Sequence, residues 1–504
     1  MRIPFLLPLL SLAAPCFAAS QEKNSLAITG LFVDIINATA LEHLKGTLKK
    51  PDPAVVPALK AFEKGLEKIM KNNRKYTITK TERLPPNGDK HYYYSFAPYW
   101  WPDCKKVKNV TNPETQCPFK QRDGQVNPDA KKLTAGSTMY QFISDSTNLA
   151  VAYKLYDKEE YARQFALLVD TFFLQEDTYM EPNLTYAQVI RGPPSEKAWI
   201  GREEGIIDTR YLVLFSTAVP LLKGSDAFTP ELDKKLKTWF QRYASWLETS
   251  KFGRAECGKK NNHATFCFAQ RAAYWHYAGN AAKARAAINS YLSGPFQTQF
   301  ESDGSQPEEL ARTLPLHYLM FNLEALTALA KLGARLGVDV WHERNKKGAG
   351  VQKAIDFVLP MALKTAESNG KWKKPDNPAL LIPTLLDAIE VYGDPRGTYQ
   401  SAVEKIRNAT NGGESNNIIH LWDMEEYEDT ILDFILYGLE SDDERSACPE
   451  GDEQWCVKVD GKRVLPSLGM FLDSAEDGVQ HVAQLARRKA EREAAIGVYD
   501  LWRW

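Results

Sequence analysis

Two stretches of the sequence gather side chains that can stabilise negative charge formed next to a carboxylate. Asn261, Asn262 and His263 stand together in the segment CGKKNNHATFC. Arg312 and Tyr318 lie in the segment EELARTLPLHYLMFNLEAL. Arginine and asparagine donate hydrogen bonds to the charge that builds up when a proton beside a carboxylate leaves. Histidine and tyrosine can take up that proton or return one.

Cleavage of an acidic sugar chain by β-elimination needs this set of side chains. The proton on C5 is only weakly acidic while the neighbouring carboxylate is charged, so Arg312 and Asn262 would neutralise that charge. His263 or Tyr318 would remove the proton, and a proton must return to the departing oxygen at C4. The scheme needs no metal ion or cofactor, because side chains supply the neutralising charge. The eight histidines also show no HxH or HxxxH spacing.

An aromatic stretch, HYYYSFAPYWWPD, offers surfaces for sugar rings. Its side chains Tyr99, Trp100 and Trp101 can stack on the apolar C–H faces of sugars. The other candidates for substrate binding are Asn261, His317, Lys90 and Arg210 of the segment GIIDTR.

Each candidate also has an ordinary structural interpretation. A lone histidine such as His263 is more often a hydrogen-bonded structural residue, and Tyr318 could be a core aromatic at the start of its helix. Arg312 could form an ion pair with Glu308 or Glu309. Trp100 or Trp101 could simply anchor the loop, and His317 could be a structural histidine. Arg210 could belong to an ion pair at a helix start. Lys90 could be a solvated charge.

The N-terminus has the pattern of a secretory signal peptide. In MRIPFLLPLLSLAAPCFAAS, one arginine precedes a short apolar run and then small residues, and we expect cleavage after Ala18. No later segment is long and apolar enough to span a membrane. The net charge of −1 favours no association with nucleic acid or acidic lipid. We therefore expect a secreted, extracellular protein.

Cysteines and sequons agree with export. Six cysteines remain after the signal peptide, and they fall into three close couples. Six cysteines allow fifteen pairings, but short loops make local pairing the simplest: Cys104–Cys117, Cys257–Cys267 and Cys448–Cys456. The absence of a CxxC pattern argues against a zinc site. The sequons suit a glycoprotein modified at Asn37, Asn109, Asn183 and Asn408.

From residue 135 onwards the chain is a succession of helical patterns. In ELDKKLKTWFQRYASWLE, apolar and aromatic side chains recur on one face, while most lysines fall elsewhere. Helices are predicted at 231–248 and at 138–156, 158–173, 208–223, 264–278, 281–292, 316–335, 351–366, 379–392, 398–408, 427–439 and 474–492. Helices in short-connected pairs without a repeat predict an all-α fold, an α/α toroid (an incomplete barrel of helical hairpins) rather than a solenoid.

The region 75–134 differs from the rest of the chain. It is aromatic, rich in proline and poorly periodic, and no convincing alternating strands are visible. Such long loops are usually functional, so we expect a lid packed onto the helical body. Apart from residues 1–18, we expect a single domain, 19–504.

Four motifs in this order make the sequence resemble the alginate lyase superfamily of polysaccharide lyases, with family 38 and its fungal relatives nearest and family 5 more distant. The motifs are SFAPYWWPD, GIIDTR, NNHATF and ELART with the following HY, and the resemblance runs from about residue 80 to 440. It implies an α/α toroid and eliminative cleavage of polyuronates. It also implies that Asn262 and Arg312 neutralise the substrate carboxylate, that His263 is the catalytic histidine, and that Tyr318 is base, acid or both.

Two other functions stay open on the sequence alone. A uronate-polymer hydrolase on the same architecture needs two carboxylates with separated pKa values, and no convincing pair is visible. A non-catalytic carbohydrate-binding protein could keep the aromatic residues but would not need His263 and Tyr318. We therefore expect a monomeric enzyme without a cofactor that acts on an anionic polysaccharide, either alginate (polymannuronate) or glucuronan.

Overall fold

The structure is a computed structural model of the chain, and it describes residues 35–36, 38–51, 56–81, 83–195, 198–368, 376–410, 457–459 and 462–464. Several predictions made from the sequence fall outside these residues. They are the signal peptide, the sequon at Asn37, the Cys448–Cys456 disulfide and the helices at 427–439 and 474–492.

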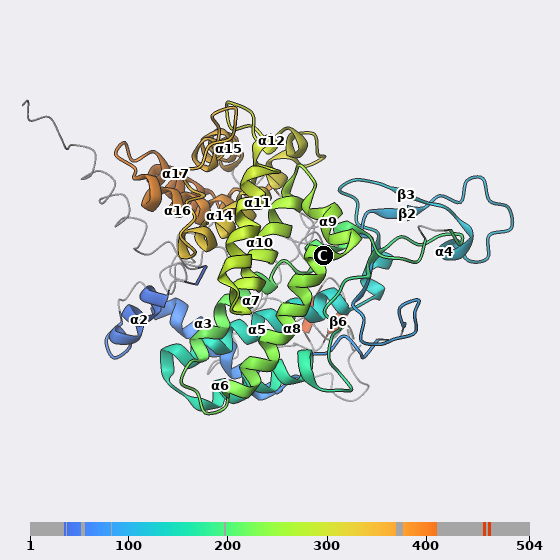
Figure 1. Cartoon of the computed structure of the whole chain (residues 1–504), viewed down its shortest axis with the longest axis horizontal. Helices are drawn as coiled ribbons and strands as arrows, with labels where there is room; N and C mark the ends of the chain where they lie inside the picture. The colour runs from blue at the N-terminus through green and yellow to red at the C-terminus, as the bar shows by residue number, and fades with distance from the viewer. Residues whose placement is uncertain are drawn as a thin grey trace, which may run out of the picture.

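The described chain is built mainly from helices, which confirms the all-α prediction (Figure 1). The long helices lie close to their predicted positions: α5 (Ala135–Tyr156), α6 (Glu159–Val169), α8 (Pro230–Thr249), α10 (Asn262–Tyr277), α11 (Ala281–Ser293), α14 (Pro315–Arg335), α15 (Val351–Ala366), α16 (Ile382–Tyr392) and α17 (Thr398–Ala409). The predicted helix at 208–223 is instead divided into η3 (Glu203–Thr209), α7 (Leu212–Ala218) and η4 (Val219–Leu222). Pro220 explains the second break, because it has no N–H to continue the helical ladder.

Two helices near the N-terminus are absent from the sequence-based prediction. These are α2 (Ala38–Thr47) and α3 (Val56–Asn72). In α3, Leu59, Phe62, Leu66 and Ile69 recur at helical spacing, and all four are buried against the core. The signal was therefore present in the sequence.

The strands are short and form two-stranded pairs among the described residues. The parallel pair joins β1 (Tyr94–Phe96) to β4 (Tyr186–Val189). The antiparallel pairs are β2 (Trp100–Pro102) with β3 (Phe119–Gln121), and β5 (Val457–Val459) with β6 (Lys462–Val464). The strands of region 75–134 have three residues each, too few to leave an alternating pattern in the sequence.

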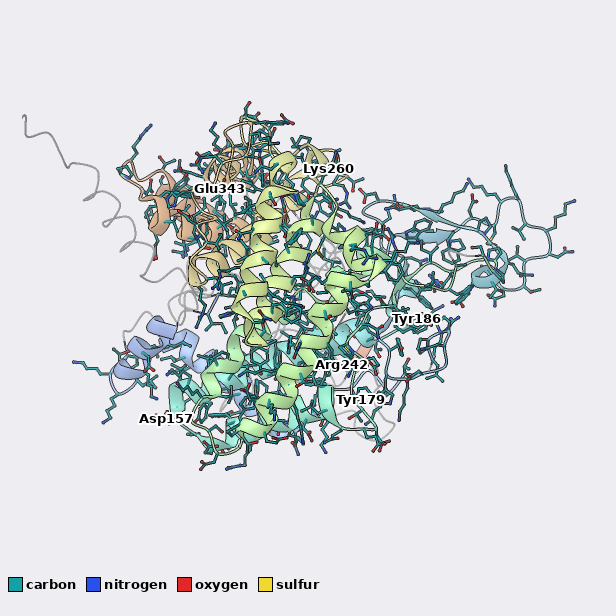
Figure 2. The ribbon with its side chains drawn as sticks, viewed as in Figure 1. Asp157, Tyr179, Tyr186, Arg242, Lys260 and Glu343 are labelled. Atoms are coloured by element: carbon teal, nitrogen blue, oxygen red, sulfur yellow. A yellow bond between two sulfur atoms is a disulfide. The ribbon has the colours of Figure 1, made fainter. Side chains whose placement is uncertain are left out.

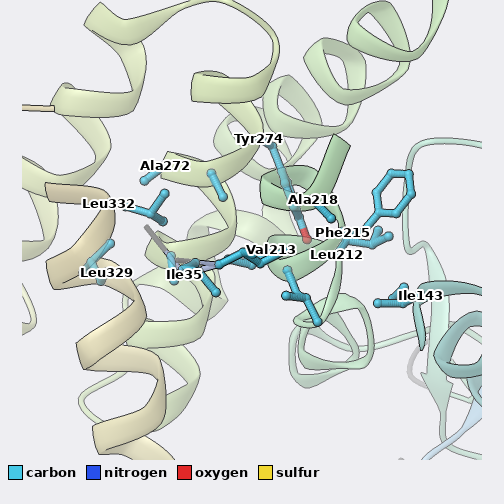
Figure 3. Close-up of a cluster of buried hydrophobic side chains, with 14 of the residues drawn as sticks. Ile35, Ile143, Leu212, Val213, Phe215, Ala218, Ala272, Tyr274, Leu329 and Leu332 are labelled. Atoms are coloured by element: carbon cyan, nitrogen blue, oxygen red, sulfur yellow. The ribbon is translucent and has the colours of Figure 1, made fainter. Parts of the chain in front are cut away.

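The core is formed where α10 packs against its neighbours. Helix α10 contacts α7, α8, α11 and α14, and Figure 1 shows α8, α10 and α11 lying lengthwise beside one another. In the close-up of Figure 3, Phe215 of α7, Tyr274 of α10 and Leu329 of α14 belong to one buried cluster. Burying an aromatic or aliphatic side chain of this size contributes about 1.5–3 kcal/mol. This packing fixes the first turns of α10 and α14, where the candidate residues stand.

One core segment passes a simple test for a membrane span. Glu203–Leu222 is long and apolar enough by composition, yet 78% of its most apolar window is buried inside the protein. That degree of burial is typical of a core segment in a folded domain.

Region 75–134 combines an anchored part with a projecting arm. Strand β1 is buried and tied to the helical body, because Tyr93 and Ser95 donate hydrogen bonds to Asp208 of η3 at 3.1 and 2.8 Å. Strands β2 and β3 form the arm at the right of Figure 1, which also carries α4 (Pro113–Gln116). Region 75–134 is called the lid region below, and its role as a lid stays a prediction.

Candidate active site

Helix α10 begins within the Asn-Asn-His run, and another segment caps its first turn. Asn261 is the N-cap residue, but its side chain makes no capping hydrogen bond. The Glu309 carboxylate takes that role, accepting from the backbone N–H of Asn262 at 2.5 Å and from its Nδ2 at 2.9 Å. A carboxylate suits this place because the first amides of a helix lack partners and carry partial positive charge. Burial raises the pKa of Glu309, while the hydrogen bonds from Asn262 oppose the rise.

His263 occupies the next position and has its own carboxylate partner. Its Nδ1 lies 2.5 Å from Oε1 of Glu256, which stands at the end of α9 (Lys251–Cys257). Lys259 Nζ lies 3.4 Å from the other oxygen of Glu256. Glu256 is 1% exposed, whereas the His263 side chain keeps 16% of its surface exposed. The His263 ring is therefore fixed by Glu256 at Nδ1, while part of its surface stays accessible to solvent.

Arg312 carries a bound carboxylate, supplied by the lid region. Its Nη2 donates to Oδ1 of Asp123 at 2.7 Å, and its Nε lies 3.3 Å from Oδ2. The ion-pair partner is thus Asp123 rather than Glu308 or Glu309, the partners that helical spacing suggests. Although burial raises the pKa of Asp123, hydrogen bonds from Arg312 and Thr313 hold it below its ordinary value.

Tyr318 lies directly against Arg312 near the start of α14. The guanidinium carbon is 3.6 Å from the centre of the Tyr318 ring. The Tyr318 hydroxyl is 3.3 Å from the hydroxyl of Tyr99, which comes from the lid region. Burial raises the pKa of Tyr318, and Arg312 and Tyr99 only partly oppose that rise. The phenol therefore stays protonated at neutral pH and can donate a proton.

One buried carboxylate connects the two halves of the site. Glu309, which caps α10, interacts electrostatically with Arg312 and His263. The negative charge of the Glu309 carboxylate also raises the pKa of Tyr318. The structure thus places Asn262, His263, Arg312 and Tyr318 around Glu309, whereas their convergence on a substrate carboxylate stays a prediction. Their individual catalytic roles stay predictions.

The two lid tryptophans have different surroundings. The Arg202 guanidinium lies over the Trp100 ring at 5.6 Å, and the buried Nε1 of Trp100 has no hydrogen-bond partner within the described part of the chain. Trp101 donates from Nε1 to the Gln125 carbonyl at 2.8 Å and stacks with Arg122. Trp101 therefore anchors its own arm, as the structural interpretation of one tryptophan expects.

The other predicted binding residues fall into three situations. Asn261 lies at the site, and its buried Oδ1 has no hydrogen-bond partner among residues that the structure describes. His317 stacks on Phe321 beside Tyr318. Arg210 is buried under the same aromatic cluster, where its Nη1 donates to the Ile207 carbonyl at 3.1 Å.

Lys90 is not brought to the site. Its Nζ lies 3.9 Å from Asp177, and the adjacent His91 stacks on Tyr179. Figure 2 shows Tyr179 far from Lys260, the residue that directly precedes Asn261. The solvated-charge interpretation of Lys90 therefore fits this structure, and contact of Lys90 with the substrate stays a prediction.

Three site residues are missing from the sequence-based prediction. Asp123 left no signal, because only the fold places it against Arg312. Glu309 was considered as an ion-pair partner for Arg312 but not as the cap of α10. Glu256 could have been found, since it precedes Cys257 and the predicted disulfide ties that cysteine to the turn after His263.

Both disulfides that fall in described residues have the predicted pairing. Cys104–Cys117 closes the arm, and Cys257–Cys267 joins the end of α9 to α10 with a Cα–Cα distance of 5.3 Å. Of the sequon asparagines, Asn109 and Asn408 are exposed, while Asn183 is partly buried and its Oδ1 accepts from the Thr185 amide. Glycosylation stays a prediction.

Replacing both Cys257 and Cys267 by alanine is expected to lower turnover more than it harms the fold. A bridge of this span stabilises a chain by about 3 kcal/mol, and the large core should tolerate that loss. The turn that carries His263 would lose its covalent link to Glu256. Turnover and thermal unfolding of the double variant are compared with those of a Cys104→Ala/Cys117→Ala variant. Unchanged turnover with a lowered melting temperature would show that the bridge is only structural.

Comparisons with known proteins agree with this geometry. A family model described as alginate lyase matches residues 77–368. An alginate lyase from Bacteroides ovatus is 29% identical with a TM-score of 0.67, and the match covers 77% of this chain and 98% of that chain. Alginate lyase A1-III from Sphingomonas species A1 is 15% identical with a TM-score of 0.43, over 74% of this chain and 92% of that chain. No curated protein matches the chain.

The family match covers more than half of the chain and includes the whole candidate site. The Bacteroides ovatus structure spans almost its full length in the comparison, which agrees with the predicted α/α toroid. The chain belongs to the alginate lyase family and is a polysaccharide lyase.

Proposed function

We propose that this lyase is a secreted enzyme that cleaves a polyuronate, alginate or glucuronan, by β-elimination. The observation that carries the proposal is that Arg312 already binds a carboxylate, that of Asp123, while its guanidinium packs on the ring of Tyr318. A uronate substrate requires a cation for its own carboxylate next to a proton donor. The alginate lyase description of the family and of the Bacteroides ovatus protein supports a substrate of this class.

Arg312 can serve a substrate without releasing Asp123. The lid carboxylate uses Nε and Nη2, which leaves Nη1 for a substrate carboxylate. Asp123 then fixes the plane of the guanidinium, so little freedom is lost when substrate binds. The Asn262 amide nitrogen lies 2.9 Å from both oxygens of Glu309, and it can also donate to the substrate when one of its two hydrogens serves both Glu309 oxygens.

The proton transfers of the elimination are assigned to His263 and Tyr318. A base takes the C5 proton, the electron pair of that bond forms the C4=C5 double bond, and the C4–O bond breaks. Tyr318, which burial keeps protonated, gives its proton to the departing oxygen. Arg312 and Asn262 stabilise the charge on the carboxylate during these steps.

Substrate stereochemistry decides which residue acts as base. In mannuronate and glucuronate the C5 proton and the C4 oxygen lie on one side of the ring, so one residue could serve both. For Tyr318 this requires that it enter the reaction as the phenolate, take the C5 proton and pass that proton to the departing C4 oxygen. In guluronate they lie on opposite sides, and His263 would take the proton. Replacement of His263 should then reduce cleavage of polyguluronate more than cleavage of polymannuronate.

Ultraviolet absorbance of the new C4=C5 bond tests the function directly. The protein is incubated with polymannuronate, polyguluronate and glucuronan, and chain length is followed alongside absorbance. We expect absorbance to rise as at least one polymer shortens. Shortening without absorbance would indicate a hydrolase, and binding without shortening would indicate a carbohydrate-binding protein.

A further inference from the structure

We infer that Glu256 is a positioning residue that holds His263 with its proton on Nδ1 and its lone pair on Nε2. The inference rests on the proposed function for its kinetic consequence, but the proton position can be measured without any substrate. Two observations carry it, the contact between the two side chains and the way the fold holds Glu256 in place.

The contact itself assigns the proton. His263 Nδ1 and Glu256 Oε1 are 2.5 Å apart, and Glu256 is 1% exposed. An ionised carboxylate has no hydrogen to donate, so the hydrogen in this bond belongs to Nδ1. The Lys259 ammonium lies 3.4 Å from Oε2 and complements the negative charge of the carboxylate. A neutral imidazole with hydrogen on Nδ1 keeps its lone pair on Nε2.

A disulfide holds the two partners in register. Cys257 follows Glu256 directly, and Cys267 lies four residues after His263, one helical turn further along α10. The bridge therefore joins the carboxylate and the imidazole through short, rigid paths on both sides. The short helix α9 cannot move away from α10 unless the Cys257–Cys267 disulfide is broken.

A charged network extends from Glu256 to the lid. Lys259 contacts Glu204 Oε1 at 2.5 Å, and Arg202 Nε donates to Glu204 Oε2 at 2.6 Å. Burial raises the pKa of Glu204, but the hydrogen bonds and charges of Arg202 and Lys259 outweigh this effect and lower the pKa to about 2. Arg202 in turn covers the Trp100 ring. These ionised groups hold Lys259 beside Glu256 at neutral pH.

The arrangement matters when Nε2 acts as the base. Accepting the C5 proton turns the imidazole into an imidazolium, and the adjacent Glu256 carboxylate stabilises that charge. Without the carboxylate, the ring can carry its hydrogen on Nε2, where the reaction needs a lone pair. At metal sites, loss of the partner that orients a histidine typically costs about 10- to 100-fold in affinity or activity, and we expect an effect of this order for Glu256.

Nitrogen NMR of labelled histidine side chains tests the assignment in the whole protein without substrate. The His263 signals are identified by their loss in a His263→Asn variant, and spectra are recorded at alkaline pH, where imidazoles are neutral. We expect hydrogen on Nδ1 in the wild type and a mixture or the opposite tautomer in Glu256→Gln. Hydrogen on Nε2 in the wild type overturns the inference, whether or not the variant folds.

Kinetics supply the second readout. Glu256→Gln should lower the kcat for polyguluronate by about 10- to 100-fold and leave KM within about threefold. The matched control is Glu248→Gln, which removes a carboxylate that pairs with Arg271 of α10 at 3.0 Å and has no contact with His263 among the described residues. The control should keep its kcat. An unchanged kcat in folded Glu256→Gln contradicts a positioning role.

The two readouts separate the inference from the proposed function. If the wild type cleaves no polyuronate, the proposed function fails, while the tautomer measurement still decides the role of Glu256. If the wild type is active and His263 carries its hydrogen on Nε2, only the inference about Glu256 fails.

Discussion

Replacing Tyr318 by phenylalanine is expected to lower kcat by about 1,000-fold or more on every polyuronate that the enzyme cleaves. The reason is that the hydroxyl supplies the proton for the departing oxygen whichever residue removes the C5 proton. Burial raises the pKa of Tyr318, so the hydroxyl is protonated at neutral pH. Phenylalanine keeps the ring that packs on Arg312 and Phe266, so the fold should be preserved.

Initial rates of absorbance and binding of an intact oligosaccharide measure the two effects separately. Binding of the substrate should change by no more than about threefold, because the hydroxyl matters mainly in the transition state. Tyr277→Phe is the matched control, since its buried hydroxyl donates to Asp233 at 2.8 Å, at the opposite end of α10 from His263. That variant should lose some stability and keep its turnover. Substantial turnover in Tyr318→Phe would mean that another group is the acid.

Replacing Arg312 by lysine should lower kcat/KM by about 100-fold or more, even though the positive charge is kept. The structure explains why charge alone is insufficient. Arg312 uses two nitrogens for Asp123 and faces the Tyr318 ring at 3.6 Å, so only a planar group with a further donor can also hold a substrate carboxylate. A lysine ammonium would bind Asp123 as a point charge and leave the substrate without a fixed partner.

The same assays check this prediction with Arg242→Lys as control. Arg242 is an arginine of α8 that is largely exposed and pairs with Glu181 at 3.1 Å, so the change should have no effect on kcat/KM. Exposed pairs of this kind contribute only about 0–1 kcal/mol to stability. Wild-type activity in Arg312→Lys would contradict the proposed contact between Arg312 and the substrate carboxylate.

The helical part of the fold could be predicted because long amphipathic helices leave a periodic pattern over many residues. Helix α8 is the clearest case, with Leu236, Trp239, Phe240, Tyr243 and Leu247 all buried on one face. The strands of the lid region could not be predicted in this way. A three-residue strand such as β1 shows no period, and its place depends on pairing with β4, about ninety residues later.

The candidate site shows the same division. Asn262, His263, Arg312 and Tyr318 could be proposed from their types and from the order of the motifs, and the structure brings them together. Lys90 shows the limit of the approach, because a charge near an aromatic motif carries no information about where the chain leads it. In the structure it faces Asp177 instead.

The sequence by itself determined the helical class, the family motifs and the two local disulfide pairings that the structure describes. It also proposed four residues for the chemistry of the site. These features are local, or they depend on residue type alone. Tertiary structure decided which carboxylate each of these residues meets: Glu309 for Asn262, Glu256 for His263 and Asp123 for Arg312. Two of these partners come from other segments of the chain, 47 and 189 residues away. Such contacts arise only when packing of α10 and α14 brings distant side chains out of water and into one place.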